Sequence, residues 1–338
     1  MKLCPHIFDG SEQAARWAQY APAVKLVGGY DRAAAWKAGN AARLVWARVV
    51  PGADDLWRHV PANSFYEAHI RPHVIHPANA AVDAWESGLN EDYRKGAGET
   101  PDYADLRARA QYEAVIAALI RADGRAPVLG QFSVGTPSGT AAEQRDAWRA
   151  YGQALRAAHS YGGYISLHAY GNVAGWTGPL DALVAVLAEL RLDVPILIGE
   201  CGHEPGWRTW RTPEQAAGDL TAYDQALARY PAVRAAAVFA SGNTPDRWME
   251  YNVDDPVIAD ALTAYGQAAP PLPPPPPPER PRFSFPGAGL RMALYEAPAG
   301  RLVRVLGANW PVDVYETRGQ WWRVTTAPSN YWVRMSFA

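Results

Sequence analysis

Short apolar runs recur eight times in the first 268 residues, and a stretch with helical character follows each of them. A continuous apolar run of this length is typical of a strand that is buried on both faces, as in a parallel sheet. The expected strands are Leu3–Phe8, Ala23–Gly28, Ala42–Val50, Ala80–Glu86, Pro127–Ser133, Gly163–Tyr170, Val194–Glu200 and Arg234–Ser241. Eight such strand–helix units predict a closed (β/α)8 TIM barrel. The alternative, a doubly wound open sheet, should carry a glycine-rich phosphate loop after its first strand, and the sequence has none there.

The segments between these runs carry helix signals. Thr140–Glu143 and Thr212–Gln215 match the capping-box pattern, in which an N-cap hydroxyl is followed three residues later by Glu or Gln. Asp105–Ala122 is rich in alanine and is followed by Gly124, which favours the end of a helix. The other helices are expected at Glu12–Tyr20, Ala33–Lys37, Ser64–His76, the segment beginning near Pro179, and Pro256–Gly266. Pro72 is expected to interrupt the third of these.

Composition narrows the functional classes. The chain has 338 residues, a net charge of −2 and 20% charged residues, which is typical of a soluble globular protein without a nucleic-acid or membrane partner. No segment approaches the roughly 18 apolar residues that a membrane span requires. Cys4 and Cys201 are expected to be free thiols. The N-terminus lacks the apolar stretch of a secretory signal, so synthesis in the cytoplasm is expected.

The C-terminal part changes in character. Residues 269–281 are dominated by proline and predict a stiff polyproline II linker of roughly 3 Å per residue. From 282 to 338, short alternating runs separated by turn residues predict a small all-β barrel. The predicted organisation is therefore a TIM barrel over residues 1–268, a linker over 269–281 and a β-module over 282–338.

Two carboxylates follow expected strands at the carboxyl ends, where barrel active sites lie. Glu91 follows the fourth strand and Glu200 ends the seventh. A carboxylate in such a place is costly to desolvate unless partners hold it, which is typical of catalytic groups. Cleavage of a glycosidic bond needs one acid to protonate the leaving oxygen and a second carboxyl group as nucleophile or base. We therefore predict that Glu91, as acid/base, faces Glu200, as nucleophile, across a sugar-binding cleft, at roughly 5–5.5 Å.

Further polar and aromatic residues at the same ends are candidates for contacts with the substrate. His168 and Tyr170 are two residues apart on one strand, so both side chains point to one face. Tryptophans after the sixth to eighth strands offer flat faces for sugar stacking, with loop packing as their alternative role. A structural ion pair is the alternative role for Arg48. The substrate-binding candidates are Arg48, Asn90, His168, Tyr170, Trp176, Trp207 and Trp248.

Residues 1–268 resemble the clan A retaining glycoside hydrolases. Asn90-Glu91 matches that clan's Asn-Glu pair after strand four, and Ile198-Gly-Glu200 matches its nucleophile on strand seven. His168-Ala-Tyr170 matches a His-x-Tyr motif on strand six, and Trp248 corresponds to a tryptophan after strand eight. The resemblance implies a retaining, endo-acting β-glycosidase in which two carboxylates do the chemistry, without a metal or an organic cofactor.

The chain departs from this clan at one place. Related members often carry Trp-Glu-x-x-Asn-Glu, whereas the segment Trp85–Glu91 has one residue more. Either a bulge absorbs the additional residue, or Glu86 takes the role of the acid.

The C-terminal module resembles a bacterial SH3-like domain, on the segments Gly319–Val324 and Tyr331–Arg334. Such modules usually hold their enzyme to a bacterial cell wall. The resemblance implies a monomeric lysin, similar to phage endolysins and autolysins, that reaches the wall after release and cleaves peptidoglycan or an associated polysaccharide.

Three alternatives remain open at this point. The barrel could act on a non-wall β-glycan, or bind a glycan without cleaving it. Cys201 beside His203 is the single hint of an amidase or peptidase. His69, His73 and His76 have a spacing that metal ligands can show, but Pro72 and the lack of a supporting carboxylate or cysteine pattern favour packing or surface roles.

Overall fold

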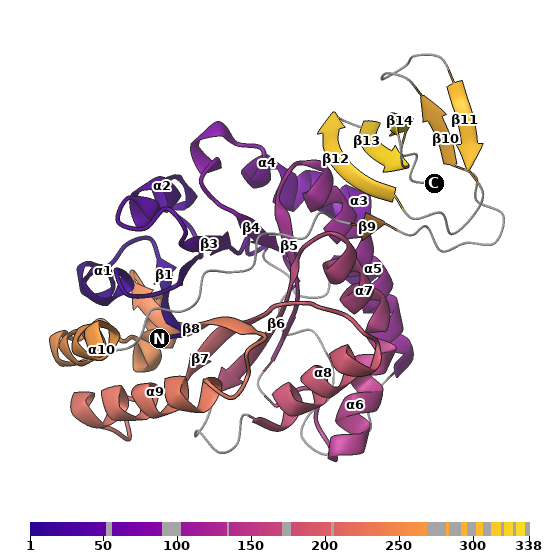
Figure 1. Ribbon diagram of the computed structural model, residues 1–338. Coiled ribbons are helices and arrows are strands. Elements are labelled where there is room, and N and C mark those ends of the chain that lie inside the picture. The colour runs from indigo at the N-terminus through magenta and orange to yellow at the C-terminus, as the bar shows by residue number, and fades with distance from the viewer. Residues whose placement is uncertain are drawn as a thin grey trace.

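The computed structural model describes residues 1–51, 56–89, 103–133, 135–170, 177–203 and 206–268, and six short strands between Arg282 and Arg334. In its first part, eight parallel strands close into a barrel in sequence order (Figure 1). The strands are β1 (Leu3–Phe8), β2 (Ala23–Leu26), β3 (Leu44–Ala47), β4 (Ala84–Glu86), β5 (Ala126–Phe132), β6 (Tyr164–Tyr170), β7 (Ile196–Gly202) and β8 (Val233–Gly242). Pairing of β1 with β8 completes the ring, so the predicted TIM barrel is confirmed and the open sheet is excluded.

Helices surround the strands. They are α1 (Glu12–Ala18), α2 (Ala33–Lys37), α3 (Ala62–Phe65), α4 (Arg71–Val74), α5 (Tyr103–Ala122), α6 (Ala141–Ala150), α7 (Gly152–Ser160), α8 (Thr177–Glu189), α9 (Pro213–Leu227) and α10 (Pro256–Ala268). Both capping boxes are confirmed. The hydroxyls of Thr140 and Thr212 accept hydrogen bonds from the backbone N–H three residues on, and the backbone N–H of each threonine donates to the side chain of Glu143 or Gln215. Among the described residues, no helix is both long and apolar enough to cross a membrane.

The helix expected at Ser64–His76 is divided into three parts. A π-helical turn, Tyr66–Ile70, separates α3 from α4, and Pro72 lies in the first turn of α4. Proline is tolerated there because it has no N–H to donate and the first turn needs none. The predicted interruption therefore lies just before Pro72, at Tyr66–Ile70, and Pro72 itself belongs to the helix that follows.

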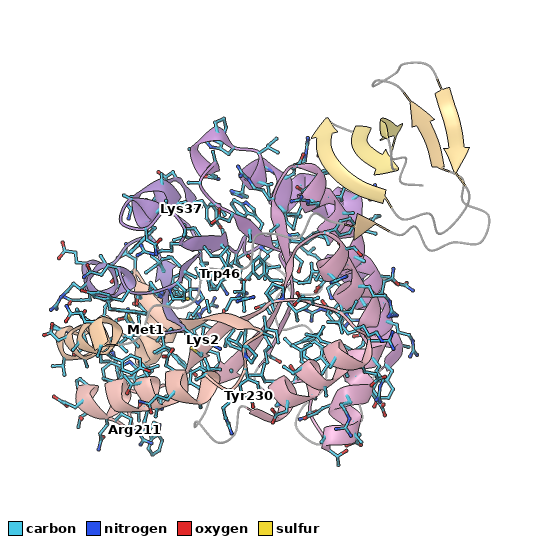
Figure 2. All side chains as sticks on the ribbon, in the orientation of Figure 1. Met1, Lys2, Lys37, Trp46, Arg211 and Tyr230 are labelled. Atoms are coloured by element: carbon cyan, nitrogen blue, oxygen red, sulfur yellow. The ribbon has the colours of Figure 1, made fainter. Side chains whose placement is uncertain are left out.

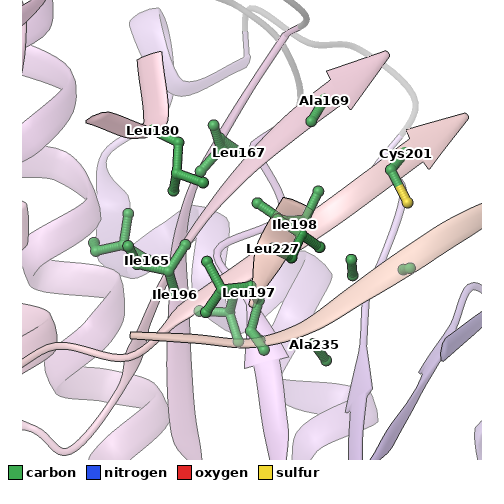
Figure 3. Close-up of a cluster of buried hydrophobic side chains, with 14 of the residues drawn as sticks. Ile165, Leu167, Ala169, Leu180, Ile196, Leu197, Ile198, Cys201, Leu227 and Ala235 are labelled. Atoms are coloured by element: carbon green, nitrogen blue, oxygen red, sulfur yellow. The ribbon is translucent and has the colours of Figure 1, made fainter. Parts of the chain in front are cut away.

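Side chains along β6 alternate between the apolar layer under the helices and the polar interior of the barrel. Ile165, Leu167 and Ala169 belong to the apolar cluster between the strands and the helices, and Leu180 of α8 lies beside them (Figure 3). The intervening residues, among them His168, point to the opposite face of the strand, as its period of two requires. The apolar side chains thus pack against the helices, while the interior carries the side chains that are available for chemistry.

A polar network closes the amino-terminal end of the barrel. Lys2 Nζ donates to the carbonyl oxygens of Leu227 and Tyr230 at 2.7 and 2.6 Å, and Asp224 accepts from the backbone N–H of Leu3 at 2.9 Å. Figure 2 labels Lys2 and Tyr230. These bonds fix β1 to the end of α9.

The C-terminal strands form one antiparallel sheet in the order β11-β10-β14-β13-β12-β9 (Figure 1). They are β9 (Arg282–Phe283), β10 (Met292–Tyr295), β11 (Leu302–Leu306), β12 (Val312–Arg318), β13 (Trp321–Thr326) and β14 (Ser329–Arg334). The residues described in this part form strands, as expected, and their closure into a small barrel stays a prediction. The linker predicted at 269–281 lies outside the described residues.

Candidate active site

Glu200 is held by two side chains of the neighbouring strand β6 and by Arg48, which directly follows β3. Arg48 Nη1 donates to its Oε1 at 2.7 Å, and Tyr170 Oη donates to its Oε2 at 2.7 Å. His168 Nδ1 lies 3.6 Å from the same Oε2, because His168 pairs with Glu200 in the register of β6 and β7. The structure therefore brings four of the sequence-predicted site residues together at the carboxyl end of the barrel.

A second layer lies beneath these residues. Lys25, on β2, contacts Glu86 Oε1 at 3.0 Å and the carbonyl oxygen of Gly199 at 3.0 Å, and its Nζ is 3.7 Å from Glu200 Oε1. Trp46, near the centre of the barrel in Figure 2, donates from Nε1 to Glu86 at 3.2 Å. Lys25 and Glu86 are each 0% exposed, whereas Glu200 is 6% exposed. Glu200 is therefore the more exposed of the two carboxylates.

The charges around Glu200 favour its ionised form. Burial by itself would raise its pKa, but the electrostatic effects of His168, Lys25 and Arg48 outweigh burial, so that the pKa lies well below the usual range of a glutamate. Burial lowers the pKa of His6 well below its usual range, so this ring is neutral near pH 7. Among the described residues, Lys25 and Arg48 are the two cationic side chains within 4 Å of Glu200 Oε1, at 3.7 and 2.7 Å.

Aromatic rings form a wall next to the carboxylate. The ring of Tyr170, whose hydroxyl holds Glu200, lies 5.9 Å from Phe239 and 5.7 Å from Tyr251. Trp248, on the short helix Asp246–Tyr251 after β8, lies 5.8 Å from both Phe239 and Tyr251 and is half-buried. Aromatic groups with an apolar face and a polar edge suit the alternating surfaces of a sugar ring.

The tryptophans of the β7 loop divide into a buried and an exposed one. Trp207 is 4% exposed and its Nε1 donates to the carbonyl oxygen of Asn252 at 2.9 Å, so this side chain anchors the loop and offers no open face. Trp210 is 63% exposed and is the tryptophan of this loop that a ligand can reach. The expected stacking role does not fit Trp207, because a buried indole satisfies its N–H within the protein. Trp176 lies outside the described residues.

The two candidate acids, Glu91 and Glu86, differ in what the structure describes. Asn90 and Glu91 lie outside the described residues, and β4 ends at Glu86. Glu86, the alternative acid, is enclosed by Lys25 and Trp46. A general acid must come within hydrogen-bond distance of the leaving oxygen, and an enclosed carboxylate does not meet that condition. The geometry of Glu86 therefore favours a structural charge.

The thiol alternative conflicts with the structure. Cys201 is fully buried, and burial raises the pKa of its thiol well above the usual range, so the nucleophilic thiolate is disfavoured. His203 Nε2 lies 3.4 Å from Asp219 Oδ2, on α9. Among the described residues, no group of three or more His, Cys, Asp or Glu side chains is arranged to hold a metal ion. His73 instead packs against the rings of Tyr30 and Trp85.

Gly199 makes room for the groups around Glu200. A Cβ at this position would lie 2.5 Å from Ser166 Oγ and 3.3 Å from His168 Cδ2. We expect Gly199→Ala to lower the free energy of unfolding by roughly 1–3 kcal/mol, because overpacking forces neighbours off their preferred rotamers. Chemical denaturation measures this loss. The double variant Gly199→Ala/Ser166→Ala should recover much of it, and a loss that Ser166→Ala does not relieve would contradict the steric explanation.

Sequence reasoning missed Lys25, the counter-charge role of Glu86, and the ring of Phe239. A lone lysine inside the short apolar run Ala23–Leu26 is the one signal that could have been used, because a buried ammonium requires an oxygen partner. Nothing in the sequence specifies which of the 34 acidic residues that partner is.

Comparison with known proteins gives a similar fold at low identity. No protein-family model matches the sequence, and no curated protein matches it. A glucosidase from Croceicoccus marinus is 12% identical with a TM-score of 0.47, over 79% of this chain and 66% of that chain. A β-mannanase from Thermomonospora fusca is 15% identical with a TM-score of 0.45, over 78% and 87%. A Faecalibacterium prausnitzii β-glucuronidase is 13% identical with a TM-score of 0.46, over 80% and 49%.

The chain therefore spans just under two thirds of the glucosidase and about half of the glucuronidase. Identities and TM-scores of this size carry no argument about activity. The barrel is established by its own strand pairing, which closes between β1 and β8.

Proposed function

We propose that this chain is a retaining glycoside hydrolase that cleaves β-glycosidic bonds in a bacterial cell-wall glycan, either peptidoglycan or an associated polysaccharide. The observation that carries the proposal is the state of Glu200. It lies at the carboxyl end of a barrel strand, its low pKa keeps it ionised, and it accepts hydrogen bonds from Arg48 and Tyr170 at 2.7 Å each. A fixed and ionised carboxylate is what attack on an anomeric carbon requires.

In the proposed reaction, one oxygen of Glu200 attacks the anomeric carbon while the bond to the leaving oxygen breaks. Glu91 donates the proton that the leaving oxygen takes, and later accepts a proton from the water that releases the sugar from Glu200. Arg48 and Tyr170 orient the attacking carboxylate, and His168 lies beside the same oxygen as Tyr170. Two carboxylates suffice for this chemistry, so the proposal includes no metal or organic cofactor.

We place the sugar against the aromatic wall of Tyr170, Tyr251 and Trp248, with Asn90 and Trp176 as further contacts. The half-buried Trp248 supports this placement, since its ring joins that wall. Stacking on aromatic faces orients a sugar without fixing which hydroxyl groups it carries.

The C-terminal sheet is proposed to be an SH3-like module that holds the enzyme to the wall. Six short antiparallel strands support this role, since small all-β modules of this kind present loops and edges for recognition. The enzyme would act as a monomer at the wall after leaving the cytoplasm. The competing function is a hydrolase of a non-wall β-glycan, which the same barrel chemistry would serve.

Mass spectrometry of products from purified bacterial cell walls tests the proposal. We expect new reducing ends on glycan fragments and, by NMR of the first products, the β-anomer, because double displacement retains configuration. Soluble plant and fungal β-glycans, incubated in parallel, should stay uncut. Free peptide stems would show an amidase instead, and cleavage of the soluble glycans alone would move the substrate away from the wall.

A further inference from the structure

Lys25 lies between both carboxylates of the barrel interior. Its side chain is 0% exposed, and its Nζ contacts Glu86 Oε1 at 3.0 Å, the carbonyl oxygen of Gly199 at 3.0 Å and Glu200 Oε1 at 3.7 Å. Gly199 immediately precedes Glu200 on β7. One ammonium therefore contacts the backbone before the carboxylate as well as the carboxylate itself.

We propose that Lys25 is a positioning residue for Glu200, which sets the orientation of that carboxylate and holds its negative charge, and that Glu86 serves as its counter-charge. The inference rests on the proposed function in one respect, namely that Glu200 is the nucleophile. It adds a residue from β2 and one from β4 to a site otherwise built from β3, β6 and β7.

Charge balance supports this role. Lys25 and Arg48 carry two positive charges, and Glu86 and Glu200 carry two negative charges, so the four groups together are neutral. Arg48 Nε also lies 3.9 Å from Glu86 Oε2, which links all four into one network. Buried ions are costly to desolvate, and a pair that only filled space could be replaced by apolar residues without loss. Lys25 also contacts Glu200, so the Lys25–Glu86 pair has a function that two apolar residues could not perform.

The groups that face Glu200 come from four strands or their ends, and a fifth strand contributes through Lys25. His6 approaches from β1, Lys25 from β2, Arg48 from β3, and His168 and Tyr170 from β6, while Glu86 of β4 acts through Lys25.

The positive members of this set outweigh burial and lower the pKa of Glu200. Removing Lys25 should therefore raise that pKa, since an opposite charge at this distance favours the charged form.

Four variants separate positioning from mere structural pairing. Lys25→Met removes the ammonium and leaves Glu86 buried without it, whereas Lys25→Met/Glu86→Gln removes both charges. Glu86→Gln alone leaves Lys25 with Glu200. The matched control is Arg109→Met/Glu113→Gln, since Arg109 and Glu113 form another buried ion pair at 3.0 Å on α5.

The measurement is NMR titration of carboxyl carbons in protein labelled at glutamate, with Glu200 assigned by comparison with Glu200→Gln. In the double variant at Lys25 and Glu86, we expect thermal stability to recover relative to Lys25→Met. The pKa of Glu200 should still lie about one unit or more above that of the unchanged protein. The control pair should lower stability without moving that pKa. An unchanged pKa of Glu200 in the folded double variant would overturn the proposal.

Glu86→Gln keeps the test decisive if the lysine variants fail to fold. With Lys25 retained and one negative charge removed, the pKa of Glu200 should stay the same or fall, and a rise would overturn the proposal. The titration needs no substrate, so it also separates this inference from the function. A pKa that rises as expected in a protein that cuts no glycan would remove the function and keep the positioning role. Glycan cleavage together with an unchanged pKa of Glu200 would remove the positioning role and keep the proposed function.

Discussion

Glu200→Gln is expected to lower the rate of glycan cleavage on the order of a thousandfold or more while the barrel stays folded. An amide has the shape of the carboxylate but cannot attack the anomeric carbon, so the step that forms the covalent intermediate is lost. Tyr170 can still donate to the remaining oxygen, and Arg48 loses its charged partner. Release of reducing ends from purified walls measures the rate, and circular dichroism shows that the fold is kept.

The matched control is Glu113→Gln. Glu113 is 0% exposed, and accepts from Arg109 at 3.0 Å and from the backbone N–H of Gly130 at 2.8 Å, outside the proposed site. This variant should lose stability but cleave walls at an ordinary rate per folded molecule. Wall cleavage by Glu200→Gln at the rate of the control would remove Glu200 from the role of nucleophile.

The low pKa of Glu200 makes the free energy of unfolding depend on pH in the acid range. Because the pKa of Glu200 is lower in the folded protein than in the unfolded chain, its ionised form stabilises the fold above the unfolded-state value of roughly 4.3. That contribution is lost as the pH falls from there toward the folded-state pKa. Acid unfolding followed from pH 7 downward should therefore be less steep in Glu200→Gln than in the unchanged protein over this range.

The sequence was sufficient for the parts of the site that depend on strand periodicity. His168 and Tyr170 lie on one face because side chains alternate along β6, and the apolar run before Glu200 forms β7 as expected. The capping boxes at Thr140 and Thr212 likewise depend only on residues three apart. Local patterns of this kind need no knowledge of distant neighbours.

Sequence alone was not sufficient where contacts join distant strands. Lys25 and Glu86 are 61 positions apart, and only closure of the barrel brings their charges to 3.0 Å. The two tryptophans of the β7 loop, Trp207 and Trp210, have the same local composition around them but differ from 4% to 63% in exposure. Packing of the loop against the segment that ends at Asn252 decides which tryptophan is buried. The spacing of residues along the sequence does not predict that packing.

Glu91→Ala is expected to show the leaving-group dependence of a missing acid. Cleavage of the natural glycan should fall by a factor of about 10²–10⁴, because its leaving oxygen needs a proton in the transition state. Aryl β-glycosides with acidic phenols need no such proton in the first step and should lose much less in that step. Added azide should then replace water in the second step and give a β-glycosyl azide, which mass spectrometry and NMR identify.

Glu86→Ala is the comparison that decides between the two candidate acids. Glu86 is 0% exposed and in contact with Lys25, so its loss should lower stability and slow natural and aryl substrates by similar factors. The additional residue between Trp85 and Glu91 would then be absorbed by the backbone, with Glu91 kept as the acid. If Glu86→Ala instead shows the leaving-group dependence and the azide product, Glu86 must leave its enclosure when a glycan binds. The acid would then come from the end of β4 itself, and the ion pair with Lys25 would be a resting state of the enzyme.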